Sequence, residues 1–224
     1  MSTIDLEPIH GALVARTDTP RRAWLAEAAE RTAGFVLLGM ASPVIASAAL
    51  VLVALSGRSP FVAHLRVGQG GRQFWMWKLR TMWSPDEPAP AKREWVEYVV
   101  ADPTEGAKIS ADPRIASKFA AWCRRHSIDE LPQLWHVLTG EMSLVGPRPL
   151  TRSEVDRHYG EHASELLSVK PGLTGLWQVC GRSAIEFPRR AAMDLRLVRT
   201  LEPRLYFHVL LRTIPAVIRG SGAW

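Results

Sequence analysis

The chain has 224 residues, 47% of them apolar, and its 28 Lys and Arg against 22 Asp and Glu give a net charge of +6. This length allows one large domain or a domain with an attachment segment, and the basic balance suits nucleic acid, anionic lipid headgroups or phosphorylated substrates without choosing among them. The two cysteines, Cys123 and Cys180, lack metal-ligand spacing and are too few for a disulfide framework, which favours a reducing cytoplasm.

The N-terminal quarter of the chain predicts attachment to a membrane. Residues 1–19 show no periodicity and are predicted to be a mobile tail, whereas Pro20 opens a mixture of Arg, Glu and Ala at residues 20–32 that predicts an amphipathic interfacial helix. Residues 33–55 contain no charge. At about 1.5 Å per residue, a helix of this length can cross a hydrocarbon core of about 30 Å. The segment begins too far into the chain, and is too long, to be a cleavable signal peptide.

Pro43 and the charges around this apolar segment bear on how it enters the membrane. Pro43 removes a backbone hydrogen bond to the carbonyl of Gly39, and the Ser42 hydroxyl can help to satisfy the freed group. A kinked spanning helix is the simpler alternative. Basic residues concentrate on the cytoplasmic side of a membrane, so positive charge on both flanks favours a helix that dips in and returns. The flanking residues are Arg16, Arg21, Arg22 and Arg31 before the segment and Arg58, Arg66, Arg72, Lys78 and Arg80 after it.

The middle of the chain predicts an α/β portion. Residues 71–82 combine a Gly-rich turn with a short aromatic strand, and residues 113–126 carry apolar side chains at helical spacing. A second helix is expected to end at Gly140, a typical C-cap, and residues 169–182 form a turn-rich stretch around a short strand. The residues predicted to form the apolar faces are Ile115, Phe119 and Trp122 in the first helix and Leu131, Leu134, Trp135 and Leu138 in the second.

Residues 204–220 mix apolar and basic side chains near the C-terminus. Leu205, Val209 and Ile214 alternate there with several arginines. This pattern is compatible with a second helix lying on a membrane surface. It is equally compatible with a core helix, and the sequence leaves both alternatives open.

Two adjacent carboxylates, Asp129 and Glu130, stand at the predicted start of the second helix. The simplest interpretation is a capping box with Ser127 as N-cap, although Pro132 then falls where intrahelical bonds begin. Arginines beside turns and helix ends favour instead a site for a metal-bound diphosphate, because Mg²⁺ takes carboxylate and phosphate oxygens together. A carboxylate is also a competent phosphoryl acceptor that needs no general base. The arginines concerned are Arg124, Arg148 and Arg182.

The chain contains the run DPRIASKFAAWCRRHSIDELPQLWHVLTGEMSLVGPRP at residues 112–149, with KLRTM before it and VKPGLTGLWQVCGR after it. This ordered set of motifs resembles the bacterial sugar transferase family, the small monotopic phosphoglycosyl transferases also called polyprenyl-phosphate sugar-1-phosphate transferases. The resemblance extends from about residue 33 to about residue 215. The segment around Ser42 and Pro43 also looks like the re-entrant helix of that family.

The resemblance implies a two-step phosphotransfer. A UDP-sugar would give its sugar-1-phosphate to the enzyme and release UMP, and undecaprenyl phosphate would then accept the sugar-phosphate to begin exopolysaccharide, capsule or O-antigen assembly. By match to the family's motifs, Asp129 would be the nucleophile and Glu130 would hold Mg²⁺. The residues matched to phosphate-binding positions are Lys78, Arg124, Arg148 and Arg182, and Asp194 matches an acidic position with a supporting role.

The predicted architecture is an α/β monotopic membrane protein. It has an N-terminal re-entrant helix, interfacial amphipathic helices and a small, mainly helical catalytic domain at the cytoplasmic face of the bacterial inner membrane. The predicted divisions are the tail at 1–19, a membrane part at 20–57 and the catalytic domain at 58–224. The expected partners are a UDP-sugar, undecaprenyl phosphate and membrane lipids, without nucleic acid. Neither the sugar nor the oligomeric state is readable from the sequence.

The sequence departs from the family pattern at a few positions. Tyr206 stands where many members have a second C-terminal acid, and His136 replaces an Asn after the Leu-Trp pair. Ala116 and Leu197 replace a usual Thr and Tyr. The Tyr206 change puts in doubt any role for an acid at that position, and His136 is expected to pack or hydrogen-bond rather than to titrate.

Three other classes of function compete with a lipid-directed transferase. A nucleic-acid-binding protein is disfavoured by the uncharged segment and by the lack of a recognised nucleic-acid module. A catalytically silent membrane scaffold would be expected to lose Asp129 or Glu130, and both are present. A nucleotide-sugar hydrolase could use the same acids, but the membrane segment favours a lipid acceptor.

Overall fold

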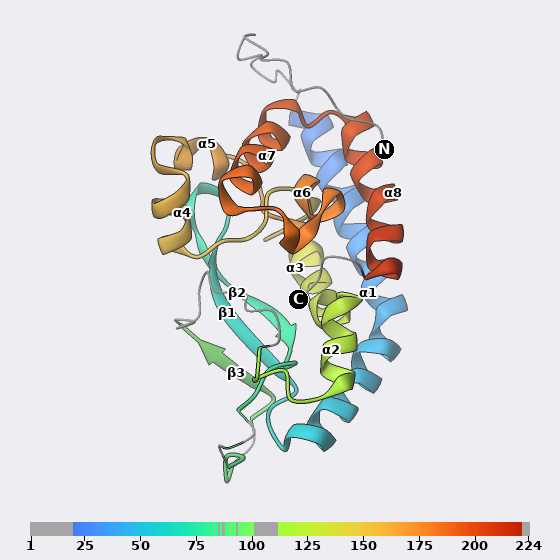
Figure 1. Cartoon of the computed structure of the whole chain (residues 1–224). Coiled ribbons are helices and arrows are strands. Elements are labelled where there is room, and N and C mark those ends of the chain that lie inside the picture. Colours follow the sequence, from blue (N-terminus) through green and yellow to red (C-terminus); the bar gives the residue numbers. More distant parts are fainter. Residues whose placement is uncertain (1–19, 85, 87, 93, 101–111, 221–224) are drawn as a thin grey trace.

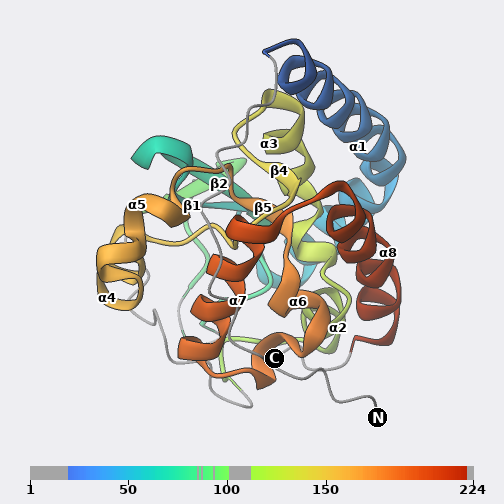
Figure 2. The same cartoon turned by 90° about the horizontal axis from the view of Figure 1, so that it is seen from above.

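The computed structural model describes residues 20–220 apart from 85, 87, 93 and 101–111, so the predicted tail at 1–19 lies outside the described residues. The described part is a mixed fold of helices and two small sheets (Figures 1 and 2). The α-helices are α1 (Pro20–Ser56), α2 (Lys118–Arg125), α3 (Leu134–Thr139), α4 (Arg152–His158), α5 (Ala163–Leu166), α6 (Leu176–Cys180), α7 (Phe187–Thr200) and α8 (Pro203–Arg219). The strands are β1 (Phe61–Val67), β2 (Gln73–Leu79), β3 (Val96–Val99), β4 (Ser143–Val145) and β5 (Gly172–Thr174). The 3-10 helices are η1 (Gln69–Gly71), η2 (Ile128–Gln133), η3 (Gly160–His162) and η4 (Arg182–Ala184).

Helix α1 joins the predicted interfacial and apolar segments into one helix with two faces. Within the described residues, Trp24–Ser56 is the stretch long and apolar enough to cross a membrane, and only 11% of its most apolar window is buried. The outer face carries Phe35, Met40 and Leu50, which are 66–73% exposed. Such a large exposed apolar surface is typical of contact with lipid or with another protein. The inner face joins the core through Ile45, Ala48, Ala49 and Leu52.

The structure confirms the hydrogen bond predicted around the proline of α1. The Ser42 hydroxyl donates to the carbonyl oxygen of Gly39 at 2.8 Å, the group that Pro43 leaves without its usual partner. The helix is not interrupted at this point, but its ribbon bends partway along its length (Figure 1). A proline inside a helix bends it because the ring presses on the preceding turn. This bend is compatible with re-entry of α1 into the membrane, which stays a prediction.

The fold contains two short sheets. The first has the order β2-β1-β3, with β1 antiparallel to β2 and parallel to β3. Strand β2 confirms the aromatic strand predicted within residues 71–82. The second sheet pairs β4 with β5 in parallel, with Ser143 opposite Gly172. A Cβ atom at Gly172 would overlap the backbone of Gly146, so these two segments meet at backbone contact.

Helices α2 and α3 fill the space between α1 and the first sheet (Figure 1). The predicted helix end is confirmed, because Gly140 caps α3 with a φ of 83°. The predicted inward positions of Trp122 and Trp135 are wrong, because these side chains are 48% and 44% exposed. Small residues, such as Cys123 of α2, occupy the buried positions instead and let the helices approach closely. The Trp135 ring stacks on Trp77 of β2 at 6.4 Å.

Helix α8 packs into the core on one side, as one of the two alternatives predicted, while its position on a membrane surface stays a prediction. Its inner side contributes the fully buried Val209 to the core, together with Val145 and Leu197. Its outer side exposes an apolar stripe at helical spacing: Phe207, Leu211, Ile214 and Ile218, which are 59–69% exposed. Helices α1 and α8 lie on the same side of the molecule in both views (Figures 1 and 2). Their exposed apolar surfaces therefore define one membrane-compatible side of the fold.

Candidate active site

The two predicted catalytic carboxylates lie on the short 3-10 helix η2 rather than at the start of a regular α-helix. The capping-box interpretation is wrong, because the Ser127 side chain makes no capping bond and its backbone is left-handed, with a φ of 55°. A 3-10 helix also accommodates Pro132, since few backbone donors are required over such a short element. The adjacent carboxylates of Asp129 and Glu130 are thus not committed to capping.

Arg182 holds the turn that leads into this pair of acids. It donates from Nη1 to the carbonyl of Arg125 at 3.0 Å and from Nη2 to the Ser127 hydroxyl. Its own backbone is also left-handed, with a φ of 52°. Non-glycine residues adopt this region at a cost and are often found at functional sites. Arg182 therefore orients the approach to η2, in addition to lining the pocket described below.

Asp129 is buried, with 7% of its surface exposed. Burial, followed by the charge of Glu130, raises the pKa of Asp129 to about 6, while the charges of Lys78 and Arg124 oppose that rise. This pKa lies above the value of about 3.9 for an unperturbed aspartate. At neutral pH the side chain is still mostly ionised, as a nucleophile must be.

Glu130 connects two of the predicted cations. Its Oε1 atom lies 2.9 Å from Nζ of Lys78 and 3.5 Å from Nη1 of Arg148. Lys78 projects from β2, and burial lowers its pKa, although Glu130 and Asp129 counteract this effect. Arg148 lies in the loop after β4. A partly buried acid shared by two cations is costly to disrupt, because removing one partner leaves charge uncompensated.

Arg124 extends from the last turn of α2. Its Nη1 atom lies 3.1 Å from the sulfur of Met82, a weak acceptor. Its Nε atom is buried and has no hydrogen-bond partner among the described residues. A guanidinium group with so few hydrogen bonds is well suited to receive an anionic ligand.

Asp194 of α7 lies deeper than the other predicted residues. It is 1% exposed and its Oδ2 atom accepts a 2.9 Å hydrogen bond from the Tyr159 hydroxyl. Burial raises the pKa of Asp194 to about 7, and the Tyr159 hydrogen bond and the charge of Arg148 limit that rise. Asp194 does not line the pocket. Its position suits the supporting role predicted for it.

One pocket of about 800 Å³ brings the acidic pair and the four predicted cations together. Asp129, Glu130 and the four predicted cations form its polar part. Apolar side chains form its other walls: Leu37, Met40, Ala41 and Val44 from α1 and Leu210, Leu211, Ile214, Val217 and Ile218 from α8. A polar floor and an apolar opening within one pocket suit a ligand with a charged head and a hydrocarbon chain.

Trp177 and Arg190 support the site but were not predicted from the sequence. Trp177 of α6 is 4% exposed, and the guanidinium carbon atoms of Arg190 and Arg148 lie 4.9 and 5.8 Å from the centre of its ring. A cation over an indole ring is stabilised by the electron density of the ring face. Trp177 therefore helps to fix Arg148. No spacing rule predicts this contact, since the three residues come from different elements.

His136 is buried and hydrogen-bonded, as predicted from the sequence. Its ring is 3% exposed; Nε2 accepts from the backbone N–H of Trp77 at 3.1 Å, and Nδ1 contacts Glu141 at 2.7 Å. Burial lowers the pKa of His136, against the opposing effect of Glu141. The imidazole thus satisfies an edge donor of β2 and does not line the pocket.

The donor set of the pocket fits Mg²⁺ only if the substrate supplies some of the ligands. The described residues contain no group of three or more His, Cys, Asp or Glu side chains placed to hold a metal ion. Two adjacent carboxylates, Asp129 and Glu130, do line the pocket beside the cations. Mg²⁺ is commonly held by one or two carboxylates together with phosphate oxygens and water, so the residues present are compatible with it.

The fold and the site together define a membrane-associated protein with an acidic pair and a cationic pocket. A family model described as bacterial sugar transferase matches residues 21–220, and the chain belongs to this family. The UDP-galactose-lipid carrier transferase of Erwinia amylovora is 36% identical over 181 residues. The undecaprenyl-phosphate galactose phosphotransferase of Salmonella typhimurium is 35% identical over 178 residues, and the exopolysaccharide production protein ExoY of Rhizobium meliloti is 33% identical over 201 residues.

These relatives differ in how much of their own length the match includes. The alignment with the Erwinia protein covers 78% of this chain and 36% of the relative. The alignment with the Salmonella protein covers 77% of this chain and 36% of the relative. For ExoY it covers 86% of this chain and 84% of the relative. The chain thus spans about a third of the two larger relatives and most of the smaller one.

Proposed function

We propose that this protein transfers a sugar-1-phosphate from a UDP-sugar to undecaprenyl phosphate and releases UMP. The main support for this proposal is that one pocket contains the acidic pair, the four cations and apolar walls from α1 and α8. The names of the Erwinia and Salmonella relatives support a lipid carrier and a galactose-containing donor. The name of ExoY supports a place in exopolysaccharide production.

In the first step, an Asp129 carboxylate oxygen attacks the phosphorus atom that carries the sugar. The bond from this phosphorus to the bridging oxygen breaks, and UMP leaves with the electron pair. The product is an acyl phosphate that links Asp129 to the sugar-phosphate. In the second step, an oxygen of undecaprenyl phosphate attacks the same phosphorus and the Asp129 carboxylate leaves. Neither step requires a general base, because both nucleophiles are ionised near neutral pH.

The cations of the pocket are proposed to bind the diphosphate and to stabilise the charge that develops on its oxygens. Arg124 is the best placed for this role, because its guanidinium group has few hydrogen bonds in the fold. Lys78 and Arg148 are both held at the Glu130 carboxylate inside the pocket, so phosphate oxygens bound beside that carboxylate would lie within reach of both cations. Bound Mg²⁺, held by Glu130, would neutralise part of the negative charge of the diphosphate.

The apolar walls of the pocket are proposed to receive the first isoprene units of the lipid acceptor. They come from the two helices whose outer faces are exposed and apolar, so a lipid can reach the acids without leaving the membrane. We place the protein at the cytoplasmic face of the bacterial inner membrane, since nucleotide sugars are cytoplasmic. The pathway would be exopolysaccharide, capsule or O-antigen assembly.

A donor screen tests this proposal against a hydrolase and a silent scaffold. The purified protein, held in lipid nanodiscs with Mg²⁺, is given UDP-galactose, UDP-glucose, UDP-N-acetylglucosamine or UDP-N-acetylgalactosamine. With undecaprenyl phosphate, at least one donor should give continuous UMP release and a sugar label in the organic phase. Without the lipid, UMP release should stop at about one per enzyme. Continuous release without lipid would identify a hydrolase, and no release with any donor would contradict the proposal.

The re-entrant membrane helix is part of the same proposal and has its own test. A cysteine at Ser2 or at Ser84 is introduced into a Cys180→Ser background, which removes the exposed native thiol while the buried Cys123 is kept. A membrane-impermeant maleimide should label both new cysteines only from the cytoplasmic side. Labelling of the two positions from opposite sides would show that α1 spans the membrane.

A further inference from the structure

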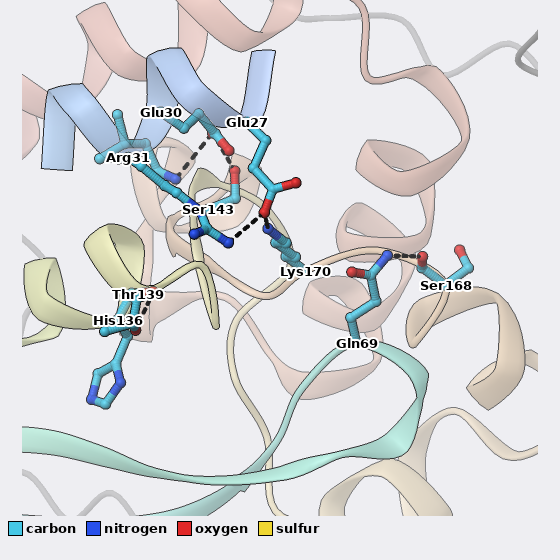
Figure 3. Close-up of polar contacts among 10 residues, drawn as sticks. Glu27, Glu30, Arg31, Gln69, His136, Thr139, Ser143, Ser168 and Lys170 are labelled. Carbon is cyan, nitrogen blue, oxygen red and sulfur yellow. Dashed lines mark hydrogen bonds and ion pairs between the residues drawn. The ribbon is translucent and has the colours of Figure 1, made fainter. Parts of the chain in front are cut away.

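Two acidic side chains, one turn apart on α1, reach from the membrane helix into the catalytic part of the fold (Figure 3). Glu30 accepts hydrogen bonds at Oε1 from the Ser143 hydroxyl at 2.5 Å, from the Leu144 backbone N–H at 3.3 Å and from the Tyr206 hydroxyl. Glu27 contacts Nζ of Lys170 at 2.9 Å. Neither acid lines the pocket, so neither contacts a ligand bound there.

The hydrogen bonds of Glu30 join three segments that are distant in the sequence. Ser143 and Leu144 belong to β4, Tyr206 belongs to α8 and Glu30 belongs to α1. All three donors are neutral and the acceptor is a carboxylate, which makes each hydrogen bond stronger than one between neutral groups. Burial and the Glu30 contact raise the pKa of Tyr206, so its hydroxyl remains a donor at neutral pH. Tyr206, which stands where many family members have an acid, therefore donates a hydrogen bond to an acid of α1, Glu30.

Strand β4 carries the effect of this contact to the pocket. It begins at Ser143 and ends at Val145, and Arg148 follows three residues later. The Gly146 N–H donates to the Thr174 carbonyl at 2.9 Å and the Gly172 N–H donates to the Pro147 carbonyl at 2.8 Å, so hydrogen bonds and a close backbone contact hold β4 and the loop after it against β5. Because β4 and this loop are continuous and are held against β5 together, we expect a shift of β4 at Ser143 to displace the loop that places Arg148 beside Glu130.

Glu27 provides a matched comparison one turn away. It contacts Lys170, which precedes β5, and Arg31 on its own helix at 2.8 Å. The Lys170 hydrogen bond is the main cause of a lowered pKa for Glu27. The side chain of Glu27 is 42% exposed, and ion pairs at such a level of exposure contribute little to stability. Glu27 shares the helix and the charge of Glu30 but not its three hydrogen bonds to β4 and α8.

We propose that Glu30 is a positioning residue for the transfer reaction. Through its hydrogen bonds to β4, Glu30 fixes the position of Arg148 relative to Glu130. The packing of α1 against β4 therefore controls the geometry of the pocket. This inference rests on the proposed function for its kinetic part. Its structural part, the control of β4 by Glu30, does not depend on which reaction the pocket performs.

The test compares Glu30→Ala, Glu30→Gln and Tyr206→Phe with Glu27→Ala in the full-length protein in nanodiscs. Glu30→Ala should lower kcat by about 10- to 100-fold with little change in donor KM, because a displacement of about 1 Å can cost that much. Glu30→Gln keeps an acceptor oxygen and should recover part of the loss. Tyr206→Phe should lower kcat by a smaller factor, and Glu27→Ala should stay within about threefold of the wild type.

A double-mutant cycle separates positioning from a general loss of structure. If Glu30 acts through Arg148, Glu30→Ala should reduce kcat by no more than about twofold in an Arg148→Ala background. Full additivity of the two losses would overturn the inference. So would wild-type kcat in both Glu30→Ala and Tyr206→Phe.

Hydrogen–deuterium exchange supplies a readout that needs no turnover. The peptide covering residues 143–150 should exchange faster in Glu30→Ala, whereas Glu27→Ala should leave it unchanged. If this increase occurs but the wild type releases UMP from no donor, positioning by Glu30 stands and the proposed function fails. If the wild type turns over but neither exchange nor kcat responds to Glu30→Ala, the proposed function stands and the positioning role is wrong.

Discussion

Asp129→Asn should abolish transfer, with a loss of kcat of at least about 10³-fold, because the other carboxylate of the pocket, Glu130, is paired with Lys78 and Arg148 and is assigned to the metal. The wild type, given UDP-sugar without lipid, should release a burst of about one UMP per enzyme. A mass increase of a hexose phosphate should then map to the peptide that contains Asp129. The variant should show neither the burst nor the adduct. A normal burst in the variant, or an adduct on another residue, would contradict the mechanism.

The same substitution carries its own control for folding. Folding raises the pKa of Asp129 to about 6. Between the ordinary carboxyl pKa and about pH 6, the folded protein therefore binds more protons than the unfolded chain does. The ionised carboxylate therefore costs stability above pH 6, and Asn removes this cost. The Tm of Asp129→Asn at neutral pH should rise by at least about 2 °C. In the wild type, the burst rate should fall as the pH decreases through about 6.

Glu130→Gln should lower kcat by about 100-fold or more at every Mg²⁺ concentration. The amide keeps an acceptor for Lys78 and Arg148 but loses the negative charge that a divalent cation requires. Chelation with EDTA should abolish turnover of the wild type, and added Mg²⁺ should restore it. The measurement is steady-state UMP release across a Mg²⁺ titration.

Glu161→Gln is the matched control for this experiment. Glu161 is an exposed acid on η3 and does not line the pocket, so its substitution should leave kcat within about twofold of the wild type. Full activity of the wild type in excess chelator would rule out a metal at this site. A normal Mg²⁺ response in Glu130→Gln would assign the cation to another ligand.

The sequence predicts those parts of the fold that depend on local chemistry. The Ser42 hydroxyl bond to Gly39 follows from the missing donor of Pro43, and the left-handed cap at Gly140 follows from the lack of a Cβ. The orientation of Trp122 does not follow from spacing, because α2 has only eight residues and closely packed small residues fill its buried positions. The direction in which the Trp122 side chain points is set by tertiary packing.

The candidate site was likewise predictable only in part from the sequence. The acidic pair and the cations are visible as residue types beside turns, and family motifs place them. The contact of Lys78 with Glu130 joins residues 52 positions apart, and that of Tyr206 with Glu30 joins residues 176 apart. No periodicity relates such pairs. The left-handed backbone of Ser127 was not predicted either, and its hydroxyl accepts a hydrogen bond from Arg182, 55 positions further along the chain.

The backbone contact between Gly146 and Gly172 limits how this protein can diversify. Any side chain at Gly172 would force the two strands apart, and Arg148 and Trp177 are each only a few residues beyond this contact. Variants with a changed donor preference must therefore arise elsewhere, on the rim of the pocket, where side chains can be exchanged without moving the strands. For directed evolution, these two glycines are positions to hold constant while the rim is randomised.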